Sequence, residues 1–180
     1  IGEDEVIDLE INRAQDLGHE MKIIAYFNAY INLGKIYHIE DDFGEVSELY
    51  TGKIVRSDLF DIVYRYRKND LGVTYTKEVT TFKIWSPITK YIKLELVDKN
   101  GNITNYDMKY KNQGVWTIKI EENIEGYKYR YNAYVNGKEK AVMDPYAIAS
   151  NANGEYGFIV DKSKFYEMKH ESKFNGNILD

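Results

Sequence analysis

Carboxylates and histidines are the residues of this chain that could catalyse a reaction or bind a metal, and their spacing favours neither. The histidines, His19, His38 and His170, are scattered, and no two share the i, i+4 spacing that places metal ligands on one helix face. Paired acids such as Asp41 and Asp42 are neighbours in a loop, whereas glycoside hydrolysis needs two carboxyls held on opposite sides of the scissile bond. The sequence therefore predicts no catalytic residue, no metal site and no cofactor.

The composition excludes further classes of chemistry. The chain has no cysteine, so a disulfide framework, a thiol nucleophile and a cysteine-rich zinc site are ruled out. Its net charge of -5 disfavours nucleic acid as a partner, because phosphates need a basic surface. No apolar run approaches the roughly 20 residues of a membrane span, so no membrane partner is expected.

Aromatic side chains remain as candidates for specific recognition. In the alternating run 127–135, Tyr127, Tyr129 and Tyr131 share one face, which we expect to belong to the core. The opposite face mixes an aromatic ring with polar groups, which suits sugars because their CH faces stack on rings while their hydroxyls bond polar atoms. The predicted glycan-binding residues are Tyr134, Asn132, Lys138 and Arg130. The alternative is an ordinary solvated face of a sandwich.

Short alternating runs recur between tight turns beyond residue 72 and predict strands. The runs are 81–85, 91–97, 103–108, 115–120, 127–135 and 138–143. Asn-Gly pairs at 100–101 and 136–137 indicate hairpins, since both residue types accept positive φ at low cost. The pattern predicts an all-β fold, an antiparallel immunoglobulin-like β-sandwich of about 90 residues. Trp85 and Trp116 are expected to anchor its core.

The first 70 residues predict a smaller β-containing segment. Residues 1–20 indicate a short helix or an arm, and runs 23–31 and 35–39 indicate two paired strands joined at Gly34. Further strand candidates lie around residues 47–50 and 53–55, and Ser57 is a candidate N-cap for a turn of helix. The expected division is a small β domain or arm at 1–70, the sandwich at 71–162 and a linker at 163–180.

The order of several motifs resembles the N-terminal region of bacterial type I pullulanases, members of glycoside hydrolase family 13. Residues 70–76 and 81–87 are similar to the beginning of their family 48 carbohydrate-binding module. Gly114-Val115-Trp116 and Glu125-Gly126-Tyr127 resemble its middle strands, and residues 143–147 and 153–157 resemble its end. Upstream, residues 27–31 and 57–60 resemble parts of the domain that precedes this module.

The resemblance implies that the parent enzyme is a retaining hydrolase of α-1,6 glucan branches with a (β/α)₈ catalytic barrel. The nucleophile, the acid and the Tyr-Asn-Trp-Gly run of that barrel do not occur here, so this piece is expected to be inactive. Its implied partner is the barrel of the same polypeptide, against which it would pack. α-Glucan, as maltooligosaccharide, pullulan or glycogen, is the other implied partner.

The resemblance departs from its pattern where glycogen-binding members use two exposed tryptophans, a lysine and an asparagine. Lys138 or Glu139 occupies one tryptophan position, and Asn132 stands where the lysine is expected. The alternative reading is a free-standing immunoglobulin-like scaffold or adhesion domain. The first residues contain no signal segment, and both the bacterial cytoplasm and secretion stay open.

Overall fold

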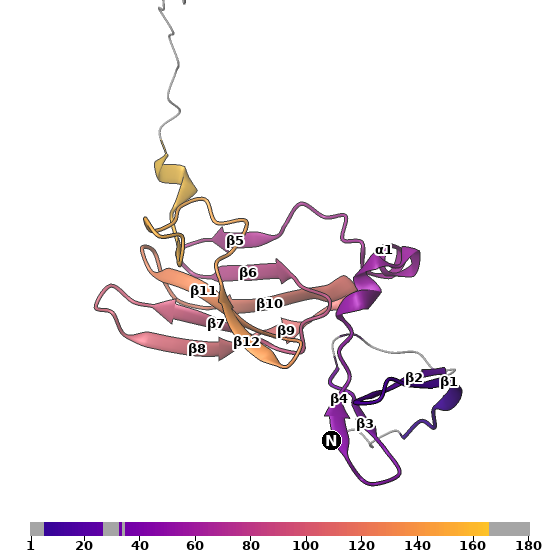
Figure 1. Cartoon of the computed structure of the whole chain (residues 1–180). Helices are drawn as coiled ribbons and strands as arrows, with labels where there is room; N and C mark the ends of the chain where they lie inside the picture. The colour runs from indigo at the N-terminus through magenta and orange to yellow at the C-terminus, as the bar shows by residue number, and fades with distance from the viewer. Residues whose placement is uncertain (1–5, 27–32, 34, 166–180) are drawn as a thin grey trace, which may run out of the picture. The chain divides into compact units, whose positions relative to one another are not determined.

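The computed structural model describes residues 6–26, 33 and 35–165 (Figure 1). The chain divides into two compact units, residues 1–32 and 33–180. In the first unit, β1 (Glu10–Asp16) pairs antiparallel with β2 (Met21–Tyr26). The turn between them uses Gly18 at φ 87°, whose amide donates to Asp16 Oδ1 at 2.7 Å. The expected helix within residues 1–20 is therefore wrong for this stretch, which forms a strand.

The expected pairing of run 23–31 with run 35–39 is also wrong where the chain is described, because β2 pairs with β1. The remainder of that prediction, including Gly34, lies outside the described residues. In the second unit β3 (His38–Glu40) pairs instead with β4 (Val46–Glu48).

Two short helices connect this hairpin to the sandwich. The first, η1 (Gly52–Arg56), takes the place of the strand expected at 53–55. The second, α1 (Asp58–Tyr64), begins at Ser57, whose hydroxyl accepts a hydrogen bond from the amide of Phe60 at 3.3 Å. The predicted N-cap is confirmed, and the helix runs one turn further than expected. No helix among the described residues has the length and hydropathy to cross a bilayer.

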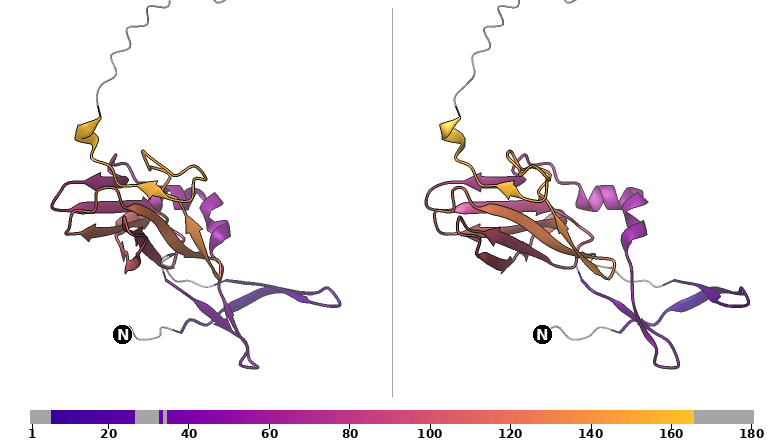
Figure 2. Two further views of the ribbon diagram at one scale, coloured as in Figure 1. Left: turned by 90° about the vertical axis from the view of Figure 1, so that its left-hand side faces the viewer. Right: turned by 60° about the vertical axis from the view of Figure 1, so that its left-hand side comes forward.

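The sandwich consists of two antiparallel sheets that lie face to face (Figures 1 and 2). The first has the order β5 (Gly72–Tyr75), β6 (Thr80–Trp85), β10 (Val115–Ile120) and β9 (Lys109–Tyr110). The second has the order β12 (Lys138–Val142), β11 (Lys128–Val135), β7 (Ile92–Val97) and β8 (Ile103–Asp107), and β13 (Gly157–Phe158) also pairs with β11. Two 3₁₀ turns, η2 (Asn112–Gly114) and η3 (Lys162–Lys164), precede β10 and follow β13. The all-β prediction is confirmed.

Alternation along the strands determines which side chains fill the space between the sheets. Ile92, Leu94 and Leu96 of β7 are at most 3% exposed, as are Tyr129 and Tyr131 of β11. Their neighbours in sequence point to the outer face, which follows from the two-residue period of a strand. The hairpin joining β11 to β12 turns at Asn136 and Gly137, with φ 50° and 74°, as the Asn-Gly pair predicts.

The two tryptophans differ in their surroundings. Trp116 is 5% exposed and packs in the core, as expected. Trp85 is 39% exposed, so the expectation that it anchors the core is wrong. Ile84 and Phe82 of the same strand point inward, and Trp85 shares the parity of the outward-facing Lys83.

Gly114 allows Pro87 to pack directly against its backbone. Its φ is 79°, and a Cβ built there would lie 2.4 Å from Pro87 Cβ. Gly101 also has positive φ, 89°, but no atom lies within 4 Å of its built Cβ. Gly114→Ala should therefore combine backbone strain with a steric clash, whereas Gly101→Ala introduces the strain alone.

We expect Gly114→Ala to lower the free energy of unfolding by about 2–4 kcal/mol and Gly101→Ala by about 1 kcal/mol. Urea denaturation followed by circular dichroism measures both. Equal losses in the two variants would show that the contact with Pro87 has no energetic weight.

Candidate functional site

The outer face of the sheet formed by β12, β11, β7 and β8 carries the residues that the sequence singles out. β11 alternates between buried and part-exposed side chains, so Arg130, Asn132 and Tyr134 point away from the core. The register places Arg130 opposite Glu95 of β7 and Asn132 opposite Lys93. Antiparallel pairing thus gathers charged, amide and aromatic groups on one surface.

Glu95 is the centre of this surface although it is only 6% exposed. Its carboxylate forms an ion pair with Arg130, with Nε 2.9 Å from Oε1, and accepts from Asn132 Nδ2 at 3.1 Å. The hydroxyl of Tyr156, from the loop before β13, donates to Oε1 at 2.8 Å. The ring of Tyr156 also lies 4.6 Å from the Arg130 guanidinium carbon, a cation–π contact.

The pKa of Glu95 reflects opposing effects. Burial by itself raises the pKa, since the charged form loses hydration. Hydrogen bonds from Asn132, Tyr156 and Arg130, together with the positive charge of Arg130, outweigh burial, so the pKa is lower than its ordinary value. The carboxylate is therefore a stable anion that fastens β7, β11 and the loop before β13 together.

A stacked pair of tyrosines lies beside this network. The rings of Tyr91 and Tyr134 are 5.0 Å apart between centroids and 15° from parallel. Tyr91 donates to Glu139 Oε2 at 3.0 Å, and Lys93 Nζ lies 5.8 Å from the centre of the Tyr91 ring. The two half-buried rings and the charged groups around them form an amphipathic patch, which we call the tyrosine patch: Tyr91, Lys93, Asn132, Tyr134 and Glu139.

The hairpin of β3 and β4 contacts the sandwich next to this patch. Tyr134 donates to Glu48 Oε2 at 2.8 Å, and this hydrogen bond raises the pKa of the Tyr134 hydroxyl. Lys90, only 9% exposed, donates to the backbone carbonyl of Leu33 at 3.2 Å and to that of Lys35. Burial lowers the pKa of Lys90, and the negative charge of Glu48 partly opposes that shift. The start of the second unit is thus fixed to the sandwich by charged groups withdrawn from water.

The structure brings three of the four predicted glycan-binding residues together. Tyr134, Asn132 and Arg130 share the outer face, but Arg130 and the Asn132 amide group are already engaged with Glu95. Lys138 pairs with Val135, so it has the opposite parity to Tyr134 and does not share its face. In a two-residue hairpin turn at Asn136 and Gly137, Val135 pairs with Lys138 and Tyr134 with Glu139. The position of the Asn-Gly pair in the sequence could therefore have identified Glu139, not Lys138, as the neighbour of Tyr134.

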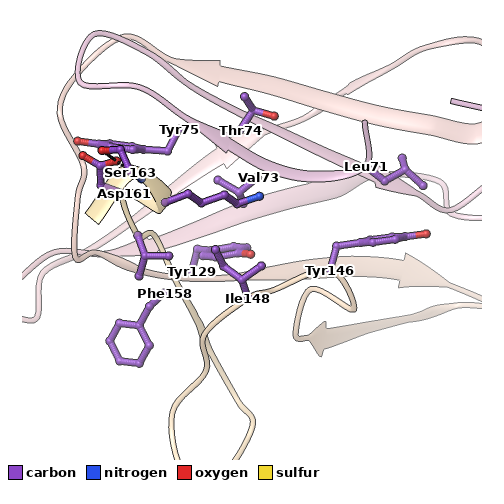
Figure 3. Close-up of a pocket in the computed structure, with 12 residues that line it drawn as sticks. Leu71, Val73, Thr74, Tyr75, Tyr129, Tyr146, Ile148, Phe158, Asp161 and Ser163 are labelled. Atoms are coloured by element: carbon purple, nitrogen blue, oxygen red, sulfur yellow. Dashed lines mark hydrogen bonds between the residues drawn. The ribbon is translucent and has the colours of Figure 1, made fainter. Parts of the chain in front are cut away.

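A cavity of about 300 Å³ lies between β5 and the segment that follows β13 (Figure 3). Apolar and aromatic residues such as Val73, Tyr129, Tyr146 and Ile148 line it together with polar groups. Its polar groups include Asp161, whose Oδ1 accepts from the amide of Ser163 at 3.0 Å. Tyr146 and Ile148 at its rim are 51% and 52% exposed.

Asp144 fixes the turn that carries these two rim residues. It is fully buried and accepts from the hydroxyl of Tyr129 and from the amide of Tyr146, both at 2.9 Å. Burial raises its pKa, and the two hydrogen bonds oppose that shift. Its role is structural, because both carboxylate oxygens already accept bonds that shape the turn.

Two family models match consecutive parts of the chain. The pullulanase N1-terminal domain matches residues 2–56, and carbohydrate-binding module 48, the isoamylase N-terminal domain, matches residues 70–147. The curated pullulanase of Bacillus subtilis (strain 168) is 26% identical over 160 residues, which cover 88% of this chain and 22% of the relative. The 1,4-alpha-glucan branching enzyme GlgB of Geobacillus stearothermophilus is 36% identical over 95 residues, 52% of this chain and 15% of the relative.

Solved structures agree with these matches. The pullulanase of Anoxybacillus sp. LM18-11 superposes with a TM-score of 0.82 at 34% identity, over 88% of this chain and 23% of that one. The type I pullulanase of Bacillus subtilis, complexed with maltose, gives a TM-score of 0.82 at 25% identity, over 88% and 22%.

The β-sandwich and its matches define residues 70–147 as a carbohydrate-binding module of family 48. With the match to the N1-terminal domain before it, the chain is similar over 88% of its length to the N-terminal region of pullulanases. It spans 22% to 23% of the length of the pullulanases it matches. This order of two domains disfavours the alternative of a free-standing scaffold or adhesion domain.

Replacing Glu95 tests the network on the outer face. We expect Glu95→Gln to lower the free energy of unfolding at pH 7 by about 2–3 kcal/mol, because Arg130 is left without its carboxylate. Since the pKa of Glu95 is depressed in the folded chain, its contribution is present above the ordinary value of 4.5 and is lost as pH falls through the folded value. The difference between wild type and variant should therefore shrink as the pH falls from 4.5 through the lower pKa of the folded chain.

Thermal unfolding from pH 7 to pH 3 measures this difference. Glu139→Gln is the matched control on the same face, and because Glu139 is exposed it should cost less than about 0.5 kcal/mol. A pH-independent difference for Glu95→Gln would mean that packing, not the charge, is responsible.

Proposed function

We propose that the sandwich binds α-glucan through the tyrosine patch. The observation that carries this proposal is the stacked pair of Tyr91 and Tyr134, flanked on the open face by Lys93 and Glu139. Flat rings offer a surface to the CH faces of glucose units, and the flanking charged groups can bond the ring hydroxyls. The Asn132 carbonyl oxygen adds an acceptor, since only the amide nitrogen is used by Glu95.

Two further observations support an α-glucan ligand. The matching family is named for carbohydrate binding, and the pullulanase of Anoxybacillus sp. LM18-11 has been solved in complex with maltotriose. For the whole protein we extend the proposal to α-1,6 debranching of glucans such as pullulan and glycogen, catalysed by a domain outside this chain. The proposed division keeps a small N-terminal β domain or arm at 1–70, the sandwich at 71–162 and a linker at 163–180.

Removing the Tyr134 ring should weaken glucan binding. Because the patch is shallow and wet, we expect a dissociation constant for maltoheptaose of about 0.1–1 mM, or roughly -5.5 to -4 kcal/mol. Tyr134→Ala should raise it about tenfold, through loss of one stacking face and disruption of the Tyr91 pair. Isothermal titration calorimetry with maltoheptaose and with a branched α-glucan measures the change.

The controls separate the patch from general effects on the sheet. Ile103→Ala truncates an exposed apolar side chain on β8 of the same sheet and should leave the affinity unchanged. Cellobiose, a β-linked glucan, should give no saturable heat. Wild-type affinity in Tyr134→Ala would remove the tyrosine patch as the binding site.

A second role, packing against the catalytic domain of the same polypeptide, is favoured by the rim of the cavity in Figure 3. Tyr146 and Ile148 expose apolar surface beside the segment where the chain leaves the module. The matched pullulanases are more than four times longer than the part that this chain covers, so a large domain is available to cover this surface. The catalytic barrel is the proposed occupant.

Ile148→Asp tests whether this surface is covered by another domain of the full polypeptide or stays exposed to solvent. In the 180-residue chain the side chain is 52% exposed, so the substitution should change the free energy of unfolding by less than about 0.5 kcal/mol. In the full polypeptide it should destabilise by about 2 kcal/mol or more, because a carboxylate is then buried at an apolar contact. Differential scanning calorimetry of both forms measures this, and equal small effects would show that the rim stays in water.

A further inference from the structure

Trp85 is partly exposed to solvent, and its one polar atom is hydrogen-bonded within the chain. The indole nitrogen donates to the backbone carbonyls of Tyr64 and Gln113, each at 2.9 Å. Phe60 of α1 packs against the indole edge to face, at 6.3 Å and 67°. These contacts orient the ring but leave 39% of the residue exposed.

The backbone around Gln113 is strained to make this arrangement. Gln113 has φ 61°, in the left-handed region that non-glycine residues rarely adopt, at a cost of about 1 kcal/mol or more. Its carbonyl accepts from Trp85, and its side-chain amide donates to the carbonyl of Arg65 at 3.2 Å. Strain of this kind persists only where the neighbours over-determine it, so the ring of Trp85 is preorganised.

Trp85 is one of the residues that line an open cleft of about 490 Å³, which is within the size range of small-molecule sites. Five of its lining residues are aromatic: Phe60, Tyr64, Tyr66, Trp85 and Tyr146. The side chains of two other lining residues, Asp61 and Arg65, make no hydrogen bond or ion pair with any described residue, although both are ionisable and exposed. The cleft therefore combines a fixed aromatic platform with an uncommitted carboxylate and guanidinium.

We infer that this cleft is a second α-glucan subsite, separate from the tyrosine patch. A glucose unit would stack its CH face on Trp85, while Asp61 accepts from ring hydroxyls and Arg65 donates to them. The uncommitted polar groups distinguish the cleft from the tyrosine patch, where the Asn132 amide nitrogen and the Tyr134 hydroxyl are bonded within the chain. The inference rests on the proposed function for its ligand class but uses none of the residues of the tyrosine patch.

Tryptophan fluorescence tests the cleft without relying on the tyrosine patch. The chain has two tryptophans, and Trp116 is buried at 5% exposure, so acrylamide quenching reports mainly on Trp85. Saturating maltoheptaose should lower the acrylamide quenching constant at least about twofold, since a stacked sugar shields the exposed ring. In Trp85→Phe the emission of Trp116 alone should not respond to the sugar.

Variants on α1 keep the test decisive if Trp85→Phe perturbs folding. Asp61→Asn should raise about fivefold the maltoheptaose concentration that gives half of the change in the quenching constant. Leu59→Ser, on the same helix but outside the cleft, should leave it unchanged, because Leu59 is 65% exposed and makes no part of the lining. Equal responses in these two variants would overturn the assignment of Asp61.

Combination with Tyr134→Ala separates the two sites. A quenching change that survives in Tyr134→Ala supports the cleft, whatever calorimetry shows for the tyrosine patch. Absence of any quenching change up to about 10 mM maltoheptaose overturns the cleft, and heat that Tyr134→Ala abolishes would then leave the proposed function intact. A quenching change that Tyr134→Ala abolishes also overturns the cleft, because the response would originate at the patch.

Discussion

The buried carboxylate of Glu95 constrains how one whole face of the sandwich can be used. A carboxylate that is 6% exposed needs several hydrogen bonds, and Arg130, Asn132 and Tyr156 supply them. Each of these partners comes from an element that must then stay in register with β7. The same bonds occupy polar groups that would otherwise be available to a ligand. Structural order on this face is therefore obtained from residues that look like binding residues in the sequence.

For the proposed binding of α-glucan, this constraint leaves the aromatic rings just outside the network as the available surface. Tyr91 and Tyr134 lie one pairing step beyond it, where the rings stack and only their hydroxyls are bonded within the chain. The cleft beside α1 is arranged differently. There the indole N–H donates to two backbone carbonyls, while the side chains of Asp61 and Arg65 make no hydrogen bond with the described residues. The two aromatic surfaces thus use different means to present a ring, one by pairing rings and the other by anchoring a single ring.

Local periodicity predicted most of the sandwich, since alternation and Asn-Gly turns are properties of neighbouring residues. The inward positions of β7 and β11 follow from this period, and so does the outward position of Tyr134. Trp85 shows the limit of the method. Its parity with Lys83 indicates the outer face, although the run around it is apolar, and its hydrogen-bond partners Tyr64 and Gln113 lie 21 and 28 residues away.

The pairing of the first strands shows a second limit. β2 offers an apolar run that can pair with either neighbour, and the short turn at Gly18 selects β1. Three of the four residues predicted to bind glycan share a face, as periodicity alone indicates, whereas the engagement of Arg130 and Asn132 by Glu95 depends on cross-strand register.

Charged groups withdrawn from water also connect the sandwich to the chain on either side of it. Lys90 donates to the carbonyls of Leu33 and Lys35 at the start of the second unit, and Asp144 shapes the turn that leads out of β12. Apolar contacts at these places would tolerate sliding, whereas each buried charge is satisfied in one geometry only. The path of the chain into and out of the module is therefore fixed by electrostatics. A path fixed in this way suits the proposed packing of the module against a catalytic domain of the same polypeptide.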